Sequence, residues 1–232
     1  MWEDSYLIDE YLENIKKIAD SIDHKDINKA CVIIYEAWMK DKTVFICGNG
    51  GSASTASHFA NDLLKLGVKT ICLNDNPAII TALTNDNGFD NIYEEQLKNL
   101  FEQKDVLIVL SVHGGAGKDK AGAWSQNLIN AVRRARVRYG KSIGLLGYDG
   151  GLLKSKVDVP IIVGNSTPLT ESWHLMVAHL ICLILKDYQP LKRCLKCNRM
   201  YKIDVLECPG CKDGNYALVG GMIGNIEELK KG

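Results

Sequence analysis

The stretch from Val44 to Asp62 constrains the fold of this chain more than any other. It reads VFICGNGGSASTASHFAND: an apolar run, a glycine-rich turn at Gly48–Gly51, and a helical pattern that opens at Ser52. A strand that leads through a tight turn into a helix presents free backbone N–H groups and the positive end of the helix dipole to one point. The turn lacks the lysine of a nucleotide P-loop, and its glycine spacing is not the dinucleotide fingerprint. The pattern therefore indicates a site for a small phosphorylated molecule.

Apolar strands alternate with helices along most of the chain, which predicts an α/β fold with a parallel five-stranded sheet flanked by helices, a three-layer, flavodoxin-like arrangement. Ligands of such sheets bind at the carboxyl ends of the strands. Three unusual segments fall there: the Gly48 turn, Asn85–Asp86 and the loop from Ser111 to Gly117. The expected strands are 43–47, 69–73, 105–111, 142–146 and 159–163, and the expected helices lie near 53–66, 77–84, 91–103, 125–139 and 168–187, after two helical patterns in 5–40.

Length and charge narrow the class of protein. A chain of 232 residues can bury one core and carry a small appendage, so we expect one domain over 1–190 and a tail over 191–232. The formal net charge is +0, which favours neither a nucleic-acid nor a membrane partner. No apolar run reaches membrane length and no signal peptide is recognised, so a cytoplasmic protein is expected. Four cysteines stand singly in apolar contexts, which suits a reducing compartment: Cys31, Cys47, Cys72 and Cys182.

The tail carries the other four cysteines in the string CLKCNRMYKIDVLECPGC. Two CxxC pairs at this spacing are typical of a structural zinc ribbon, in which four thiolates close a tetrahedral site. Such a short segment cannot build a core alone, so metal binding would supply folding free energy. A redox dithiol pair is the alternative, and the basic residues around the cysteines permit, without favouring, nucleic-acid binding. The predicted zinc ligands are Cys194, Cys197, Cys208 and Cys211.

Several segments resemble the sugar isomerase (SIS) domain, in its phosphoheptose isomerase branch. They are GNGGSASTASHFANDL, TALTNDNGFDNIYEEQL, DVLIVLS, SIGLLGYDGG and TESWHLMVAHLICLIL, and the resemblance covers roughly residues 1 to 188. It implies an isomerase that converts sedoheptulose 7-phosphate to D-glycero-D-manno-heptose 7-phosphate. It also implies a homotetramer with active sites at subunit interfaces. The tail lies outside the usual family pattern.

The resemblance implies one active-site zinc per subunit, held by His58, Asp62, Glu171 and His179. Asp62 and His179 would move the protons, and Glu171 is an alternative base. Two positions depart from the family, because Asp62 replaces a Glu and Glu171 replaces a Gln. His174 is three residues from Glu171, which is a metal-ligand spacing in its own right, so it is an alternative ligand.

The loop after Ser111 is about nine residues longer than the family's compact, hydroxyl-rich phosphate loop. We expect His113 to replace a missing hydroxyl, a glycine nest to form, Lys118 and Lys120 to add charge, and Ser125 to cap the next helix. A plain surface insertion is the alternative. The predicted substrate-binding residues are Asn49, Gly50, Gly51, Ser52, Asp86, Ser111, His113, Gly114, Gly115 and Ser125, with Gly117 part of the nest.

Two other functions remain open at this point. The replication-initiator-associating proteins resemble these isomerases but act as tetrameric scaffolds that typically lack the full metal set. An isomerase or sensor of a different sugar phosphate is the third possibility. Retention of both His58 and His179 with two carboxylates favours an enzyme. A family carboxylate just before the last helix is absent, and Pro168 stands near its place.

Overall fold

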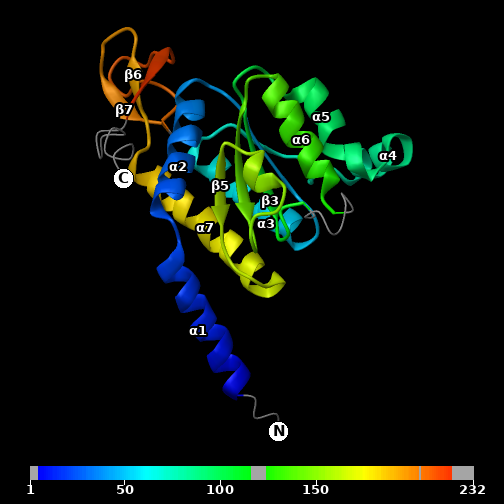
Figure 1. The fold of residues 1–232 in the computed structure, drawn as a ribbon. Helices are drawn as coiled ribbons and strands as arrows, with labels where there is room; N and C mark the ends of the chain where they lie inside the picture. Colours follow the sequence, from blue (N-terminus) through cyan, green and yellow to red (C-terminus); the bar gives the residue numbers. More distant parts are fainter. Residues whose placement is uncertain (1–4, 116–123, 204, 221–232) are drawn as a thin grey trace.

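A parallel five-stranded sheet forms the centre of the protein (Figure 1), as the alternation of strands and helices predicted. This computed structural model describes residues 5–115, 124–203 and 205–220. The strand order β2-β1-β3-β4-β5 is that of flavodoxin-like folds, in which the order of the strands reverses between β1 and β3. The strands are β1 (Val44–Gly48), β2 (Thr70–Cys72), β3 (Val106–Ser111), β4 (Lys141–Leu146) and β5 (Val159–Ile162).

Helices cover both faces of the sheet, because the central strands are buried on both sides. In β1, Val44 and Ile46 belong to one cluster of buried apolar side chains, whereas Phe45 and Cys47 belong to the other. The first cluster is completed by α2 (His24–Met39), α3 (Gly51–Leu66) and α7 (Thr167–Asp187). The second is completed by α5 (Ile92–Leu100) and α6 (Gln126–Val137), with α4 (Pro77–Asn87) and the short helix η1 (Phe89–Asn91) beside them; η3 (Leu153–Ser155) precedes β5.

Helix α7, with 21 residues, is long and apolar enough to cross a membrane by length and composition alone. It instead packs inside the protein, where Trp173, Val177 and Ile181 are buried against the sheet. Its outer face still exposes Met176, Leu180 and Leu183. A long apolar helix with one face in the core and one face uncovered is a helix that can pack against another chain.

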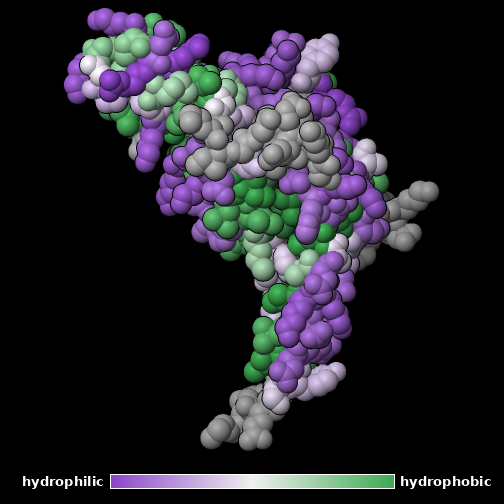
Figure 2. Space-filling view, turned by 90° about the vertical axis from the view of Figure 1, so that its left-hand side faces the viewer, coloured by the Kyte–Doolittle hydropathy of each residue, from purple (hydrophilic) through white to green (hydrophobic). Residues whose placement is uncertain are grey.

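Helix α1 (Ser5–Ser21) projects away from the rest of the molecule (Figure 1) and contains no buried residue. Apolar side chains line one edge of it in the space-filling view (Figure 2), and Tyr6, Leu7 and Ile8 are each more than half exposed. At its other end Ile15 and Ile18 pack against the main core, and the hydroxyls of Tyr11 and of Ser172 in α7 lie 3.0 Å apart.

The tail forms a three-stranded antiparallel sheet in the order β7-β6-β8, made of β6 (Leu191–Cys194), β7 (Met200–Lys202) and β8 (Tyr216–Val219). Ile203 packs onto the main core, and a Cβ placed on Gly67 would lie 3.6 Å from both Ile203 and Trp38. Gly67 ends α3 and leads into β2, and Trp38 lies in the last turn of α2 before β1. The tail therefore sits at the amino-terminal edge of the sheet, opposite the edge where ligands bind.

The observed strands lie within one residue of the predicted ones. One local prediction was wrong. Ser125 stands at the N-cap position of α6, but it has a positive φ of 58° and its side chain makes no cap hydrogen bond. Its hydroxyl instead lies 3.5 Å from that of Ser111, because the left-handed backbone turns the side chain away from the helix and towards β3.

Candidate functional site

The glycine-rich turn lies at the carboxyl end of β1 and is held in shape by side chains from elsewhere in the fold. The Asn74 side chain accepts a hydrogen bond from the Gly48 N–H at 3.2 Å and donates one to the Gly48 carbonyl at 2.9 Å. A Cβ on Gly48 would lie 2.6 Å from the Ser52 carbonyl oxygen, so only glycine fits there. Gly50 has a φ of 58°, which glycine adopts without strain. The turn is a rigid entry to α3.

A cavity of about 330 Å³ opens between the carboxyl ends of β1 and β3, where the order of the strands reverses. The predicted residues Asn49, Ser52, Ser111, His113 and Ser125 all line it. The fold therefore brings together in one cavity side chains that are up to 76 positions apart in the chain. Their roles in binding remain predictions.

Asn49 is fixed by a reciprocal amide pair with Asn127, with hydrogen bonds of 3.0 and 2.9 Å, and the Tyr93 hydroxyl also donates to its oxygen. One Asn49 N–H is left for a ligand by these contacts. Asn127 and Tyr93 were missed in the sequence analysis. Tyr93 lies within TALTNDNGFDNIYEEQL, one of the segments that resemble the SIS family, and this position could have identified it as a site residue.

The loop after β3 begins with two glycines in left-handed backbone, Gly114 and Gly115, with φ of 61° and 74°. The Gly114 N–H donates to the Ser111 hydroxyl at 3.0 Å. A Cβ on Gly114 would lie 2.0 Å from the Gly150 carbonyl oxygen, so the glycine is required by close packing of two loops. The expectations for Gly117, Lys118 and Lys120 fall outside the described residues.

A second cluster of functional groups lies where α3 passes α7. The Nε2 atoms of His58 and His179 are 3.1 Å apart, and Asp62 Oδ2 lies 3.2 Å from the first and 3.7 Å from the second. His58 and Asp62 share a face of α3 because they are four residues apart. The histidine side chains are about half exposed, at 49% and 47%, so the cluster is open to a ligand.

These three donor atoms suit a zinc ion. Donors about 2.0–2.2 Å from a tetrahedral metal lie about 3.3–3.6 Å from one another, and the observed separations of 3.1, 3.2 and 3.7 Å bracket that range. Two imidazoles and a carboxylate also form a chemically suitable ligand set, and they leave a fourth position for a substrate.

Glu171, the fourth predicted ligand, lies apart from this cluster. Its carboxylate packs on Gly51 at the start of α3, where a Cβ would meet Glu171 Oε1 at 2.3 Å. Gly51 precedes His58 by seven residues, which corresponds to about 10 Å along the helix axis. This arrangement does not bring Glu171 to the other three donors, so its role as ligand or base remains a prediction.

His174, the alternative ligand, is fully buried on the inner face of α7 and is not among the clustered donors. Burial lowers the pKa of its imidazole to about 4, despite a backbone contact with Leu146 that acts in the opposite direction. Neither ring nitrogen has a well-formed hydrogen bond among the described residues. His174 is therefore a neutral core histidine.

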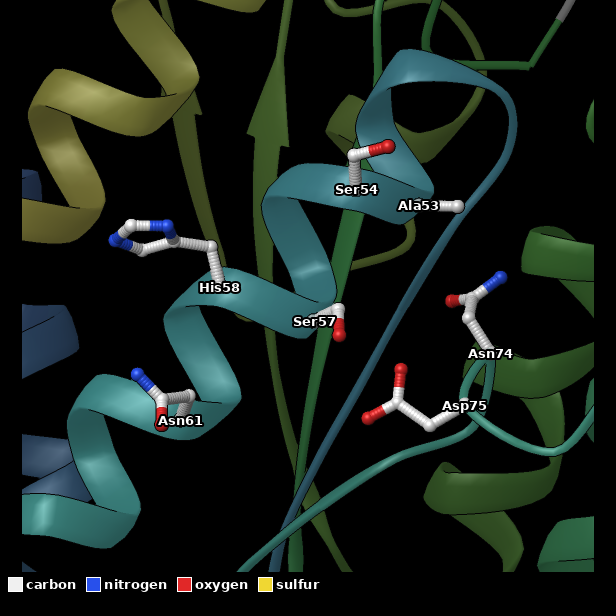
Figure 3. A pocket seen from close by; sticks show the side chains of 7 residues that line it. All are labelled: Ala53, Ser54, Ser57, His58, Asn61, Asn74 and Asp75. Atoms are coloured by element: carbon white, nitrogen blue, oxygen red, sulfur yellow. The ribbon is translucent and has the colours of Figure 1, made fainter.

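A wide polar hollow of about 580 Å³ lies on the other flank of α3 (Figure 3). Ser57 on the helix faces Asp75 in the segment after β2, while the His58 ring points away from Asp75 towards α7. Asn74 and Asp75 were not singled out from the sequence, although their position directly after a strand was the signal that would have found them. Asp86, by contrast, is exposed on α4, accepts a hydrogen bond from Asn85 at 2.7 Å and lines neither cavity.

The four tail cysteines converge as their spacing predicted. All four Sγ atoms lie within 4.8 Å of one another, and the Cys194–Cys211 and Cys197–Cys208 separations are 3.5 and 3.4 Å. Sulfur atoms around a tetrahedral zinc lie about 3.8 Å apart, so the cluster can hold a metal. Burial acts to raise the pKa of the Cys208 thiol, but hydrogen bonds from the backbone of Cys211 and Gly210 lower its pKa to about 6. A thiolate, the form that binds metal, is thereby favoured.

Comparisons with known proteins agree with this geometry. The SIS domain family matches residues 10–136. A phosphoheptose isomerase of Aliarcobacter butzleri is 34% identical over 192 residues, which cover 79% of this chain and 97% of that protein. The lincomycin biosynthesis protein LmbN of Streptomyces lincolnensis is 40% identical over 163 residues, which cover 65% of this chain but only 58% of that longer protein.

Solved structures give the same relationship. Phosphoheptose isomerase GmhA from Neisseria gonorrhoeae superimposes with a TM-score of 0.69 and 26% identity, over 78% of this chain and 95% of that one. A phosphoheptose isomerase from Francisella tularensis gives a TM-score of 0.67 and 25% identity, over 78% and 94%.

Proposed function

This chain belongs to the SIS domain family, in the branch of the phosphoheptose isomerases, and we propose that it is a metal-dependent aldose–ketose isomerase of a sugar phosphate. The proposed reaction converts sedoheptulose 7-phosphate to D-glycero-D-manno-heptose 7-phosphate. The observation that carries the proposal is the convergence of His58, Asp62 and His179 from two helices, with separations that suit zinc.

The distance between the two parts of the site supports a seven-carbon substrate. Ser52 in the serine-lined cavity and His58 in the zinc cluster are six residues apart on α3, or about 9 Å along its axis. The six carbon–carbon bonds of an extended heptose cover about 8 Å, since each bond of about 1.5 Å advances the chain by less than its length. A phosphate near Ser52 would therefore leave C1 and C2 near His58.

The phosphate end of the site is built from hydroxyls. Ser52, Ser111 and Ser125 line one cavity, and the start of α3 adds the positive end of its dipole. Replacing Ser52 by Ala removes one charge-assisted hydrogen bond, so we expect sugar-phosphate binding to weaken by about 1–2 kcal/mol. Binding of an unphosphorylated sugar provides the control, because it should change little.

The reaction moves one proton from C1 to C2 of the ketose through an enediol, with no net oxidation. Asp62 is the proposed base that removes the C1 proton and returns it to C2. His179 is the proposed acid that donates a proton to the C2 carbonyl oxygen and takes one back from the C1 hydroxyl as the aldehyde forms. A bound zinc would supply Lewis-acid stabilisation of negative charge on oxygen. Glu171 remains the alternative base, and Asn49 and Asp86 are proposed to contact sugar hydroxyls.

The proposed assembly is a homotetramer with active sites at subunit interfaces. In its support, the apolar side chains Met176, Leu180 and Leu183 are exposed on α7, the helix that also carries His179, and α1 exposes a second apolar face. Covering these faces would enclose the half-exposed histidines. A reducing, cytoplasmic setting is also proposed, because all eight cysteines are free.

An isomerase assay on several ketose phosphates, combined with metal analysis, tests the function. Sedoheptulose 7-phosphate should be turned over with the highest kcat/KM, and a chelator should abolish turnover until zinc is restored. Turnover of none of the ketose phosphates by the zinc-loaded protein would contradict the isomerase and favour a scaffold protein.

A further inference from the structure

Aromatic side chains gather at the mouth of the serine-lined cavity. Phe89, His113 and Trp124 line it, and Tyr148 stacks on the far side of His113 with ring centroids 4.9 Å apart and planes within 19°. Trp124 packs on His113 from another direction, at 4.7 Å and 52°. In the described part of the chain, seven Phe, Tyr and Trp side chains are more than a third exposed, and three of them belong to this rim.

Each ring comes from a different segment and is fixed by backbone features. Tyr148 has a φ of 52°, an uncommon and strained conformation for a bulky residue, and its N–H donates to the Gly164 carbonyl at 2.9 Å. Trp124 precedes Ser125, which is also left-handed. Asn130 of α6 donates to the Asp90 carbonyl at 2.9 Å and so anchors the short helix that begins at Phe89. Strain of this kind, concentrated beside a cavity, points to a functional constraint.

The cavity thus has two kinds of lining. The buried Ser52 and Ser111 form its floor together with the half-buried Asn49 and Ser125, and a phosphate and sugar hydroxyls would find hydrogen bonds there. The more exposed side chains of Phe89 and Trp124 form its rim. The face of an aromatic ring carries a partial negative charge, which attracts the slightly positive C–H groups of a sugar ring. A cavity of about 330 Å³ lies near the lower end of the range of ligand pockets, about 300–1,000 Å³, and is large enough for a monosaccharide phosphate.

We propose that Phe89 and Trp124 form a platform that binds the C–H face of a sugar phosphate in its cyclic form, with the phosphate on the serine floor. This inference rests on the proposed function only in taking a sugar phosphate as the ligand. The rim selects the closed ring before the open chain reaches the zinc cluster, and it sets specificity without touching the reacting atoms.

Calorimetric titration of the full-length, zinc-loaded protein tests the platform. The variants are Trp124→Ala, Phe89→Ala and the conservative Trp124→Phe, with Tyr139→Ala as the matched control at an exposed aromatic residue outside the cavity. The probes are sedoheptulose 7-phosphate, glucose 6-phosphate as a closed ring, its open-chain alditol glucitol 6-phosphate, and inorganic phosphate.

Each alanine variant should bind the cyclic sugar phosphates about 3- to 10-fold more weakly, the range expected for loss of one aromatic contact. Glucitol 6-phosphate and inorganic phosphate should change less than twofold, and Trp124→Phe should retain most of the affinity. Equal losses for all probes would show that the rim only supports the loops, and unchanged affinities would show that the rings do not contact the sugar. Either result overturns the platform.

These results are independent of turnover. An active isomerase whose alanine variants show no ring-selective loss of affinity would refute the platform alone. A protein that binds cyclic sugar phosphates through the rim but isomerises none of them would refute the proposed reaction alone. Unchanged sugar binding with a lower mass by light scattering in Trp124→Ala would identify the rim as a protein contact and would also overturn the inference.

Discussion

Exchanging the two carboxylates of the site for amides, one at a time, should separate their roles. Asp62→Asn removes the one carboxylate that the described residues place among the zinc-cluster donors, 3.2 Å from His58 Nε2 and 3.7 Å from His179 Nε2. Glu171→Gln changes a carboxylate that packs on Gly51, about 10 Å further back along α3. Both substitutions keep the size of the side chain, so differences in packing are small.

The expected magnitudes follow from this geometry. A proton-transfer group contributes roughly 10²–10⁴ in rate, which corresponds to about 3–5 kcal/mol of transition-state stabilisation, so Asp62→Asn should lower kcat/KM by that factor. It should also lower the zinc content from two equivalents per subunit to one, because a neutral amide is a poor zinc ligand. Glu171→Gln, which restores the family's residue, should keep both zinc ions and most of the activity.

Metal content and steady-state kinetics, measured on the same preparations, decide which carboxylate binds zinc and acts as the base. A zinc ion bound by the tail would serve as an internal reference, since the four cysteines lie at the opposite edge of the sheet and should retain one equivalent throughout. A Glu171→Gln variant that loses activity and zinc while Asp62→Asn keeps both would refute the assignment of the base to Asp62. Full activity in both variants and in His179→Ala would show that this cluster is not the catalytic centre.

Three further predictions concern the tail, the core and the assembly. Changing both Cys194 and Cys208 to Ser should remove one equivalent of zinc and lower the melting temperature while leaving kcat/KM nearly unchanged; unaltered metal content would refute the ribbon. Between pH 6.5 and 4 the imidazole of His174 takes up a proton in the unfolded protein but not in the folded one, where its pKa is about 4. The unfolding free energy therefore decreases as the pH is lowered through this range. Lowering the pKa from 6.5 to about 4 corresponds to about 3 kcal/mol of unfolding free energy, and urea unfolding of His174→Leu should lack that part of the pH dependence; an identical dependence in both proteins would contradict it. Finally, Leu183→Glu, on the exposed face of α7, should lower the mass measured by light scattering, whereas a monomeric parent protein would contradict the tetramer.

The local sequence determined most of the fold. The runs VFICG and VLIVLS are apolar at nearly every position, which is typical of strands that are buried on both faces, and the structure places both at the centre of the sheet. The glycine turn after the first run and the CxxC pairs of the tail could also be predicted from the sequence, because a tight turn and a metal knuckle are each formed by neighbouring residues. His58 and Asp62 share a face through helical periodicity alone.

Tertiary structure decided which residues the side chains of the last helix contact. An α-helix turns about 100° per residue, so Glu171 and His179 point about 80° apart around its axis and lie about 12 Å apart along it. Which neighbour each side chain meets then depends on how α7 packs: His179 meets His58, Glu171 meets the start of α3, and His174 enters the core. No spacing rule contains that packing.

The aromatic rim was likewise decided by the assembled fold. Phe89 belongs to the short helix η1, whereas His113 and Trp124 belong to the connection between β3 and α6. They line one cavity because β1 and β3 are neighbours in the sheet while α6 anchors η1. Sequence fixes what a segment forms with its immediate neighbours, through backbone sterics and periodicity. Contacts between distant segments depend on the packing of the whole chain, and it is those contacts that shape the cavity and separate the two carboxylates.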